Sequence, residues 1–359
     1  MRRMKKFIDI PYQVNTIFVM LGFGCNFNCK YCMQSDYKLS PMKEEKIDEC
    51  VDFIKYYSEL AFQGDYPLQV NFFGGEPLMY FDKIKYIVNA LKDCNVVYTV
   101  ITNGSLISGE VLDFINDHNI SVCISWDGRN TEYSRNVDVF KTNRENLFNI
   151  KNGFFVSGVM NSSMYPKEFF EDLEKLENDL SEYRGEEIKI GFNLDCLYNL
   201  GHENDVYNID FQRLYEEIKE MSHNYIYDSD KNSKFANYYI NELVNNLKGA
   251  VDIENFMSMC MNGIHTLNLD LNGNLHMCHD VDNKVLGTIY SDVESYMNNF
   301  HKYNNIAPDY YKNTCVNCEV RYLCNGGCSL ISKEERDEYY CPQRKILFMP
   351  IIEELMKLK

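Results

Sequence analysis

The sequence contains no run of about 18 or more apolar residues, which is the length that a membrane-spanning helix needs. Its first residues, MRRMKKFIDIPYQ, are basic but are not followed by a long apolar segment, so we expect no secretory signal. The chain also lacks an excess of positive charge, because 36 Lys and Arg residues against 53 Asp and Glu residues give a formal net charge of -17. Such a surface repels phosphate backbones on average. We therefore expect a cytoplasmic protein with neither a membrane nor a nucleic acid as its partner.

Cysteine, in contrast, is abundant: the 359 residues include 14 cysteines. The cytosol keeps thiols reduced, so clustered cysteines in a cytosolic chain indicate metal binding rather than a disulfide framework. Three lie together between residues 25 and 32, and seven lie between residues 260 and 341. We expect the remaining four to behave as small apolar core residues; these are Cys50, Cys94, Cys123 and Cys196.

Short apolar runs alternate with amphipathic stretches over roughly the first 200 residues. The runs that we expect to be strands are 15–23, 68–77, 96–105, 120–128, 153–160 and 187–197. The stretches between most of these runs have the apolar spacing of helices, so the pattern predicts an α/β fold with a parallel sheet and helices outside it. Six such units are fewer than the eight of a closed TIM barrel. A partial, open TIM-type barrel and a doubly wound sheet both fit.

Unusual polar segments follow four of these runs: CNFNCKYC, GGEP, TNG and SWDG. Parallel α/β sheets build their functional sites at the carboxyl ends of the strands. The four segments should therefore meet at one edge of the sheet, which favours a barrel-like site.

The pattern changes after about residue 205, where helical stretches rich in Tyr and Asn form a bridge. Short strands follow, with a hairpin expected to turn at Asn272–Gly273. We predict an N-terminal extension (1–14), a barrel (15–204), a helical bridge (205–257), a small cysteine-rich α+β domain (258–345) and a closing helix (346–359).

The first cysteine cluster, CNFNCKYC, has the spacing C-x3-C-x2-C. A structural zinc site needs four ligands, and no fourth ligand is visible nearby. A 4Fe–4S cluster also takes four ligands, normally all cysteine, so three local cysteines leave one iron open to a non-protein ligand. Incidental cysteines and a zinc loop remain the alternatives.

This spacing, with an aromatic residue at Tyr31 before the last cysteine, resembles the signature of the radical SAM enzyme superfamily. The resemblance implies that Cys25, Cys29 and Cys32 hold a 4Fe–4S cluster whose open iron binds S-adenosylmethionine (SAM). It also implies an enzyme in which an electron from the cluster cleaves SAM to a 5′-deoxyadenosyl radical, which abstracts a hydrogen atom.

The strand-end motifs extend the resemblance. GGEP matches a family motif that contacts the SAM amino group, with Glu76 as the acceptor and glycines that let the backbone approach a ligand. Polar groups at the next two strand ends are expected near the SAM ribose and methionine, and arginines downstream near its carboxylate. Asp127-Gly128 is also a plain turn signal. The expected cofactor-binding residues are Tyr31, Gly74, Gly75, Glu76, Pro77, Asn103, Ser125, Asp127, Arg135 and Arg144.

The seven C-terminal cysteines resemble the pattern of the SPASM domain, which follows the barrel in many peptide- and protein-modifying radical SAM enzymes. A zinc ribbon would need two C-x2-C pairs, and this region has one. The resemblance implies two auxiliary 4Fe–4S clusters with interleaved ligands. The first takes Cys260, Cys278 and Cys328, and the second takes Cys315, Cys318, Cys324 and Cys341.

Three clusters with these ligand sets need eleven protein thiolates, but the two motifs supply ten. We therefore expect an open iron on the first auxiliary cluster, available to a substrate thiolate or to a distant side chain such as Cys196. An open iron suits thioether formation, because thiolate is a natural ligand of iron and binding deprotonates it.

The resemblance thus predicts a peptide maturase that joins a cysteine sulfur to a carbon of a ribosomally made precursor peptide. Carbon–carbon crosslinking, epimerisation and formylglycine formation in a sulfatase are alternatives, and an iron–sulfur electron carrier is the non-enzyme alternative. For formylglycine formation the base would be an Asp next to the SPASM cysteine, and the candidate here, Asp280, is shifted by one position. Residues 1–14 are too few for a leader-binding domain, so we expect either a separate leader-binding protein or a leader site on the barrel. A flavodoxin or ferredoxin is the expected reductant.

Overall fold

The structure is a computed structural model of the chain and describes residues 6–35, 46–199, 204–249, 262–279, 284–304, 314–324, 326–328 and 331–358. Each run predicted as a strand contains one. The strands are β1 (Thr16–Met20), β2 (Leu68–Phe73), β3 (Val96–Thr102), β4 (Ser121–Ser125), β5 (Phe155–Val159), β6 (Gly191–Asp195), β7 (Thr266–Asp270), β8 (Asn274–His276) and β9 (Val285–Thr288).

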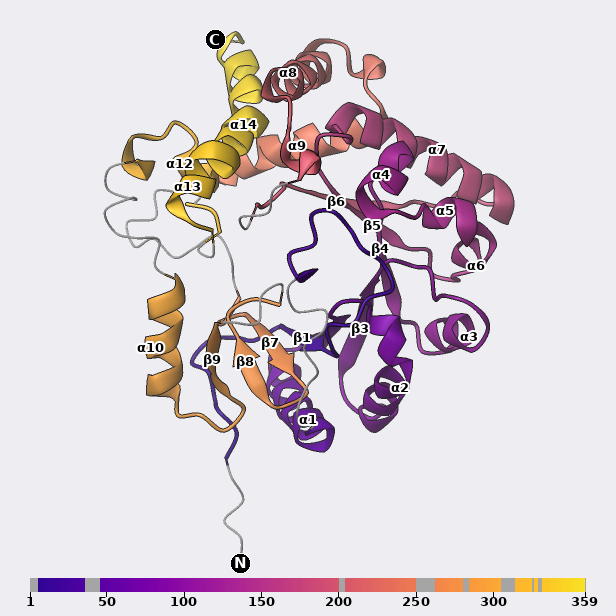
Figure 1. Cartoon of the computed structure of the whole chain (residues 1–359), viewed down its shortest axis with the longest axis vertical. Coiled ribbons are helices and arrows are strands. Elements are labelled where there is room, and N and C mark those ends of the chain that lie inside the picture. The colour runs from indigo at the N-terminus through magenta and orange to yellow at the C-terminus, as the bar shows by residue number, and fades with distance from the viewer. Residues whose placement is uncertain are drawn as a thin grey trace, which may run out of the picture.

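The strands form one nine-stranded sheet in the order β6-β5-β4-β3-β2-β1-β7-β8-β9. Strands β1 to β6 pair in parallel in chain order, and the sheet curves with helices on its outer side (Figure 1). A doubly wound sheet reverses its strand order in the middle, whereas this order does not reverse. The predicted partial (β/α)6 barrel is therefore confirmed, and the carboxyl ends of all six strands lie at one edge.

The helices are α1 (Ile47–Gln63), α2 (Phe81–Ala90), α3 (Gly109–Asp117), α4 (Thr131–Arg135), α5 (Val139–Thr142), α6 (Arg144–Phe148), α7 (Pro166–Arg184), α8 (Phe211–Tyr227), α9 (Lys234–Gly249), α10 (Val293–Asn304), α12 (Arg321–Cys324), α13 (Lys333–Glu335) and α14 (Cys341–Met356). Helices α4, α5 and α6 were not predicted from the sequence, because four or five residues are too few to show a helical period. The closing helix begins at Cys341, five residues before the predicted start, with Pro342 in its first turn, where proline is favoured.

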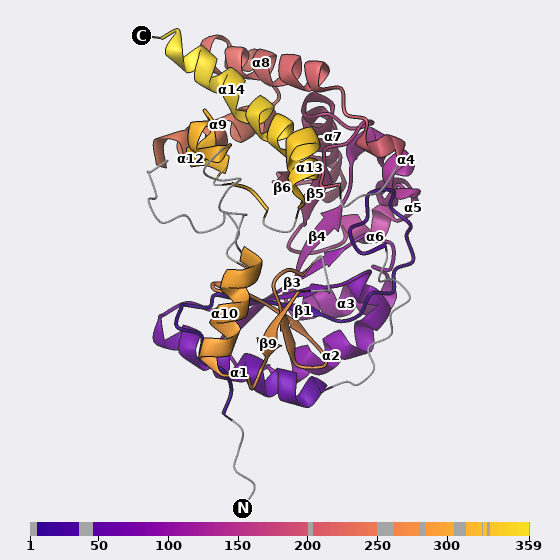
Figure 2. The same cartoon turned by 60° about the vertical axis from the view of Figure 1, so that its left-hand side comes forward.

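The C-terminal region continues the barrel sheet. Strand β7 pairs in parallel with β1, and β8 and β9 add to it antiparallel. The predicted hairpin is confirmed: β7 turns into β8 through Gly273, whose φ of 79° favours glycine. Helix α10 lies beside β9, while α12, α13 and α14 lie near α8 and α9 at the other end of the molecule (Figure 2).

One apolar core runs between the outer helices and the convex face of the sheet. Alternate residues of β1, Ile17 and Val19, are fully buried, as are Phe53 and Ile54 of α1, and all four belong to this core. Burying one such side chain contributes about 1.5–3 kcal/mol. None of the helices in the described part of the chain is long and apolar enough to cross a membrane.

Candidate active site

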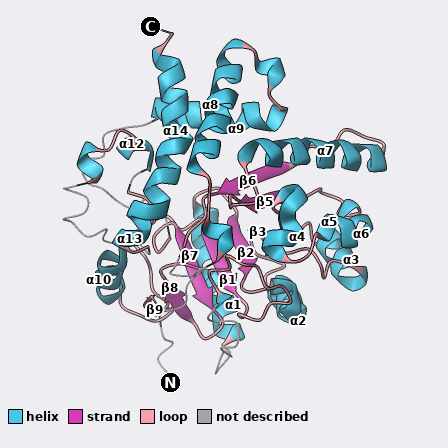
Figure 3. Ribbon diagram, turned by 45° about the horizontal axis from the view of Figure 1, so that its top comes forward, coloured by secondary structure: helices cyan, strands magenta, loops and turns pink. Residues whose placement is uncertain are grey.

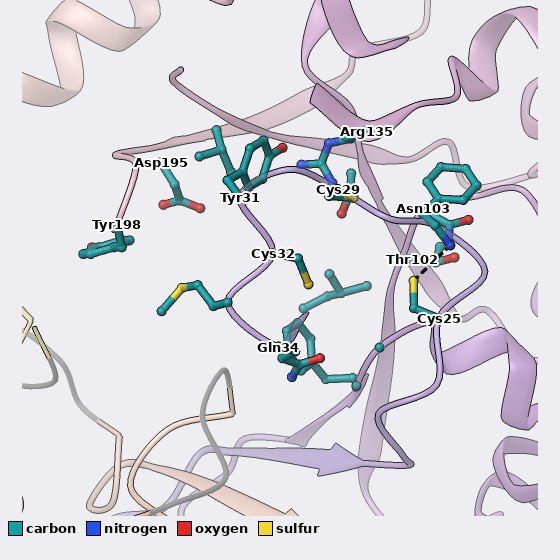
Figure 4. A pocket seen from close by; sticks show the side chains of 18 of the residues that line it. Cys25, Cys29, Tyr31, Cys32, Gln34, Thr102, Asn103, Arg135, Asp195 and Tyr198 are labelled. Carbon is teal, nitrogen blue, oxygen red and sulfur yellow. Dashed lines mark hydrogen bonds between the residues drawn. The ribbon is translucent and has the colours of Figure 1, made fainter. Parts of the chain in front are cut away.

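The largest concentration of predicted site residues surrounds one cavity of about 240 Å³ at the carboxyl ends of the barrel strands. The side chains of Cys25, Cys29 and Cys32 all line it and face a common space (Figure 4). The cavity wall continues with residues from the ends of β2, β3, β4 and β6; these are Phe73, Gly74, Gly75, Thr102, Asn103, Ser125 and Asp195. The predicted meeting of the polar segments at one edge is therefore what the structure shows.

The cysteine loop follows β1 and is held by backbone hydrogen bonds within the loop and to the residues of α4. Cys32 N donates to Cys29 O at 3.3 Å, and Lys30 N donates to Ser134 O at 2.9 Å. Burial raises the pKa of the Cys29 thiol to about 11, while the Arg135 guanidinium lowers it in part. The cationic neighbour is suited to hold a thiolate at this position once the sulfur binds iron.

Gly74 and Gly75 allow the end of β2 to approach the backbone that precedes the cysteines. Gly74 has a φ of 148°, and a Cβ there would lie 2.3 Å from Gly22 O. A Cβ on Gly75 would lie 2.3 Å from Gly24 O. The glycines therefore serve a close contact between two backbone segments as well as lining the cavity.

Glu76 has a different position from the one expected for a ligand of the SAM amino group. Its carboxylate is 1% exposed and does not line the cavity. It accepts hydrogen bonds from Leu78 N (3.0 Å), Thr102 Oγ1 (2.7 Å) and Asn103 N (2.8 Å). Burial raises the pKa of Glu76 to about 6, against the lowering effect of these donors. In this conformation Glu76 positions the end of β3, and a contact with SAM remains a prediction.

Asn103 and Ser125 lie where the sequence predicts them, at the cavity wall. The Asn103 amide donates to Asn26 Oδ1 at 2.9 Å, and its oxygen accepts from Ser105 N at 2.9 Å. These bonds fix the orientation of the side chain and tie the end of β3 to the cysteine loop.

Asp127 is fully buried behind the cavity and contacts residues from three segments that line it. Its carboxylate accepts from Tyr31 Oη at 2.5 Å, Ser134 Oγ at 2.5 Å and Val159 N at 3.1 Å. The Arg135 guanidinium pairs with it at 3.1 Å. Because burial raises the pKa of Tyr31 well above its usual value, the phenol stays protonated and donates to Asp127. Tyr31 and Arg135 line the cavity, whereas Asp127 positions them.

Besides Glu76 and Asp127, two more of the expected SAM contacts do not line the cavity. Arg144 begins the outer helix α6, is half exposed, and pairs with Asp179 at 3.1 Å. Its guanidinium also lies 4.6 Å from the centre of the Phe148 ring. Of the two candidate arginines the structure brings Arg135, not Arg144, to the cavity, because α4 follows directly from the end of β4. Pro77 is buried at the start of a short 3-10 turn and does not line the cavity.

Three polar residues of the cavity wall were not among the predicted site residues, namely Gln34, Asp195 and Tyr198. Gln34 follows the cysteine loop, and its amide donates to His279 O at 2.9 Å, which joins the loop to the C-terminal region. Asp195 ends β6 and accepts from Asn193 Nδ2 at 2.8 Å. The polar exit that identified the other strand ends was present here too, in the sequence NLDCLY.

Cys196, predicted as a core residue, is buried but also lines the cavity. Burial raises the pKa of its thiol to about 11, and the Arg344 guanidinium lowers it in part. Its proposed alternative role as a cluster ligand remains a prediction.

These residues fit a 4Fe–4S cluster that binds SAM. Three thiols from one loop face one space, and polar strand ends form much of the remaining wall, on which Cys196 also lies. In the described ranges no three Cys, His, Asp or Glu side chains converge closely enough for a single metal ion. A cluster does not require such convergence, since each thiolate binds a different iron.

Residues 19–180 match the sequence model described as the radical SAM superfamily. This part of the chain is therefore a radical SAM domain. It is 26% identical over 140 residues to the radical SAM cyclopropyl synthase TigE of Paramaledivibacter caminithermalis, which is 35% of this chain and 30% of TigE. It is 32% identical over 108 residues to the uncharacterized protein MJ0907 of Methanocaldococcus jannaschii, which is 29% of this chain and 35% of that protein. The chain thus spans about a third of the length of these curated relatives.

The solved structures similar to this chain share its fold over most of its length. One is anSMEcpe with bound AdoMet, with a TM-score of 0.65, 19% identity, and coverage of 96% of this chain and 98% of that chain. Another is Streptococcus suis SuiB bound to the precursor peptide SuiA, with a TM-score of 0.56, 16% identity, and coverage of 89% and 72%. At these identities the comparison shows the fold alone.

A second cavity of about 550 Å³ lies outside the radical SAM domain, between α12, the turn before it and the start of α14. Cys315, Cys318, Cys324 and Cys341 all line it. This is the set that the sequence assigned to the second auxiliary cluster. Cys328, only four residues beyond Cys324, is absent from this wall. Cys328 therefore does not share this cavity wall with the four cysteines that line it.

The other predicted cluster ligands lie apart from this second cavity or outside the described residues. Cys278 is buried after β8, at the far end of the sheet from β6. Cys260 and Asp280 lie outside the described residues, so their roles stay predictions.

Proposed function

We propose that this radical SAM protein is a peptide maturase that forms a thioether between a cysteine sulfur and a carbon of a precursor peptide. The observation that carries the proposal is the convergence of Cys25, Cys29 and Cys32 with the polar strand ends around one cavity. The peptide is supported by the solved structures of similar fold, two of which are bound to the Cp18Cys peptide and to SuiA.

In the first cavity Cys25, Cys29 and Cys32 would hold the SAM-binding cluster. When bound, the cluster and SAM supply one-electron cleavage of SAM and abstraction of a hydrogen atom. Gly74 and Gly75 present backbone to the cofactor, and Asn103 and Ser125 present fixed polar groups. Arg135, held by Asp127, offers a positive charge for a carboxylate. The proposal thus assigns the side chains of this cavity to binding and orientation.

The second cavity would hold an auxiliary 4Fe–4S cluster on its four cysteines. Cys260, Cys278 and Cys328 would hold the other auxiliary cluster and leave one position for a substrate thiolate. A thiolate held in this way favours thioether formation over carbon–carbon crosslinking, epimerisation and formylglycine formation. The proposal includes a cytoplasmic location and a flavodoxin or ferredoxin as reductant.

The test is anaerobic reconstitution with iron and sulfide, followed by reduction with dithionite in the presence of SAM. We expect formation of 5′-deoxyadenosine by the wild type and its loss in Cys29→Ala, with less iron per chain. Cys94→Ala is the matched control, because Cys94 is half buried in the turn between α2 and β3 and lines neither cavity. Absence of 5′-deoxyadenosine from the iron-loaded wild type would support an electron carrier instead.

The identity of the product is tested on a peptide encoded beside this gene. A thioether lowers the peptide mass by two hydrogens and protects one cysteine from alkylation. An unchanged mass with a changed stereocentre would instead indicate epimerisation, and loss of two hydrogens with a free cysteine would indicate a carbon–carbon link.

A further inference from the structure

Strand β6 is the last strand of the sheet, and its outer edge has no neighbouring strand among the described residues. Asp195 O accepts from Met160 N at 2.9 Å, so the backbone groups of Asp195 point toward β5. Successive residues of a strand direct these groups to opposite sides. The N–H and C=O groups of Phe192 and Leu194 therefore point to the free edge, where no described residue bonds to them.

An aromatic groove lies at the start of this edge. The groove is a cavity of about 480 Å³ lined by β6, the start of β5, α7 and α9; its side chains include Phe155, Phe192, Phe235, Tyr238, Lys189 and Lys234. Phe155 is 55% exposed and Tyr238 is 57% exposed, which is high for aromatic side chains. Figure 3 shows β6 at the border of the sheet next to α7 and α9.

The groove carries positive charge on a chain whose net charge is strongly negative. Lys189 is exposed at its rim, and Lys234 pairs with Glu177, whose carboxylate is buried and also accepts from Ile190 N at 2.8 Å. The two lysines against one carboxylate leave a local excess of positive charge. An acidic segment fits this excess.

The groove and the active site lie at the two ends of the same strand. Asp195, Cys196, Leu197 and Tyr198, which follow from β6, line the first cavity. A strand rises about 3.3 Å per residue, so about five residues of an extended chain span the length of β6. A segment anchored in the groove and paired with the free edge would therefore reach the first cavity without a turn.

We propose that the free edge of β6 and the aromatic groove bind an extended segment of the peptide substrate as an added strand. An aromatic side chain of the segment fills the groove, an acidic side chain meets Lys189, and the segment continues into the first cavity. Backbone pairing at a sheet edge supplies affinity, and the groove supplies specificity. This inference rests on the proposed function, because it assumes that the substrate is a peptide.

The experiment measures binding of a synthetic probe to the reconstituted protein by fluorescence anisotropy. The probe is a fluorescein-labelled decapeptide in which phenylalanine and valine alternate with glutamate and serine. We expect Kd to rise at least about fivefold in Tyr238→Ala and in Lys189→Glu. The effect of Lys189→Glu should shrink at high salt, since screening weakens exposed charge pairs.

The matched controls are Tyr227→Ala, a half-exposed tyrosine on α8, and Lys175→Glu, an exposed lysine on α7. Neither lines the groove, and both should bind the probe like the wild type and retain 5′-deoxyadenosine formation. Thermal unfolding of the groove variants shows that each is folded.

The backbone contribution is tested separately with Leu194→Pro. Proline is tolerated in an edge strand where its missing N–H faces outward. This substitution removes one outward donor but leaves the ladder to β5 intact, so the probe should bind more weakly. A probe with N-methylated alternate amides should lose affinity for the wild type as well.

Unchanged probe binding in Tyr238→Ala and Lys189→Glu overturns the inference, as does equal affinity of the N-methylated probe. A dimer in sedimentation velocity that Leu194→Pro dissociates would show that the edge binds a second copy of this chain, which also overturns it. If 5′-deoxyadenosine forms but these variants bind the probe normally, the inference is overturned while the proposed function stands. The proposed function fails by itself if the wild type forms none.

Discussion

At the scale of single residues, two buried carboxylates, Glu76 and Asp127, position residues of the candidate site through hydrogen bonds. The Asp127 carboxylate accepts hydrogen bonds from Tyr31, Ser134 and Val159 and pairs with Arg135. The Glu76 carboxylate accepts hydrogen bonds from the backbone of Leu78, after β2, and of Asn103, after β3. The sequence indicated both as cofactor contacts, because an acidic residue at a strand end is compatible with either role. Both side chains are buried outside the cavity, which the local sequence does not reveal, so in this conformation they position other residues.

Replacing Asp127 with Asn should destabilise the fold by about 3 kcal/mol, because the buried Arg135 loses its counter-charge. Urea unfolding of the apo chain measures this change. The control is Asp117→Asn, whose exposed pair with Lys151 spans 4.0 Å and should change stability by less than about 0.5 kcal/mol. Equal effects of the two substitutions would contradict the role given to Asp127.

Glu76 should make stability depend on pH. Since burial raises its pKa to about 6 from 4.5, the folded chain holds a proton that the unfolded chain releases within this window. Stability from this group is therefore present at low pH and falls as pH rises from 4.5 through 6, by about 2 kcal/mol in total. Glu76→Gln does not titrate, so its unfolding free energy should fall less than that of the wild type between pH 4.5 and 7. Parallel pH profiles would argue against a raised pKa.

At the scale of elements, the strand ends were predictable and their detailed contacts were not. In the sequence, each apolar run is followed by polar residues, and most are then followed by an amphipathic stretch. This pattern predicted β1 to β6 and the edge at which their carboxyl ends meet. The stretch between β4 and β5 gave no helical signal, yet its short helix α4 carries Arg135 to the cavity. The arginine that reaches the site thus depends on a turn of helix too short to show a period.

Gly74→Ala should disturb the junction between β2 and the cysteine loop. The added Cβ would meet Gly22 O, and a φ of 148° strains any residue with a side chain, so we expect a loss of about 1–3 kcal/mol. The control is Gly185→Ala at the end of α7, where a Cβ meets no atom within 4 Å and the cost is about 1 kcal/mol.

Thermal unfolding of the two glycine variants gives the comparison of stability, and equilibrium dialysis of SAM against the reconstituted protein gives the comparison of binding. SAM binding should weaken in Gly74→Ala and stay unchanged in Gly185→Ala. Wild-type SAM affinity in Gly74→Ala would show that this backbone contact does not shape the cavity.

At the scale of the whole molecule, the C-terminal region is not a separate sheet but an extension of the barrel. The parallel pairing of β7 with β1 brings His279, which stacks on Phe18 of β1 with ring centres 4.1 Å apart, next to the strand that delivers the cysteine loop. The predicted boundary at residue 258 marks a change in sequence pattern, whereas the sheet is continuous across the two regions.

Cys318→Ala and Cys328→Ala should damage different clusters, because the second cavity includes Cys318 and excludes Cys328. Each variant should lose iron after reconstitution, and Mössbauer spectra should show different components missing. Cys94→Ala again serves as the control, with a full iron content. Identical spectra of the two variants would place both cysteines on one cluster.

The order of residues was sufficient for the fold class, the three clustered cysteines and the strand-end motifs, because each depends on local spacing and period. The division of the C-terminal cysteines between two clusters stays a prediction. Tertiary structure decided which polar groups face the cavity and which are buried behind it, as Arg135 and Asp127 illustrate. It also decided that β7 joins β1 and that β6 forms the border of the sheet in the described part of the chain. Those outcomes depend on contacts between residues far apart in the chain, where packing and burial, not local pattern, determine the position of each side chain.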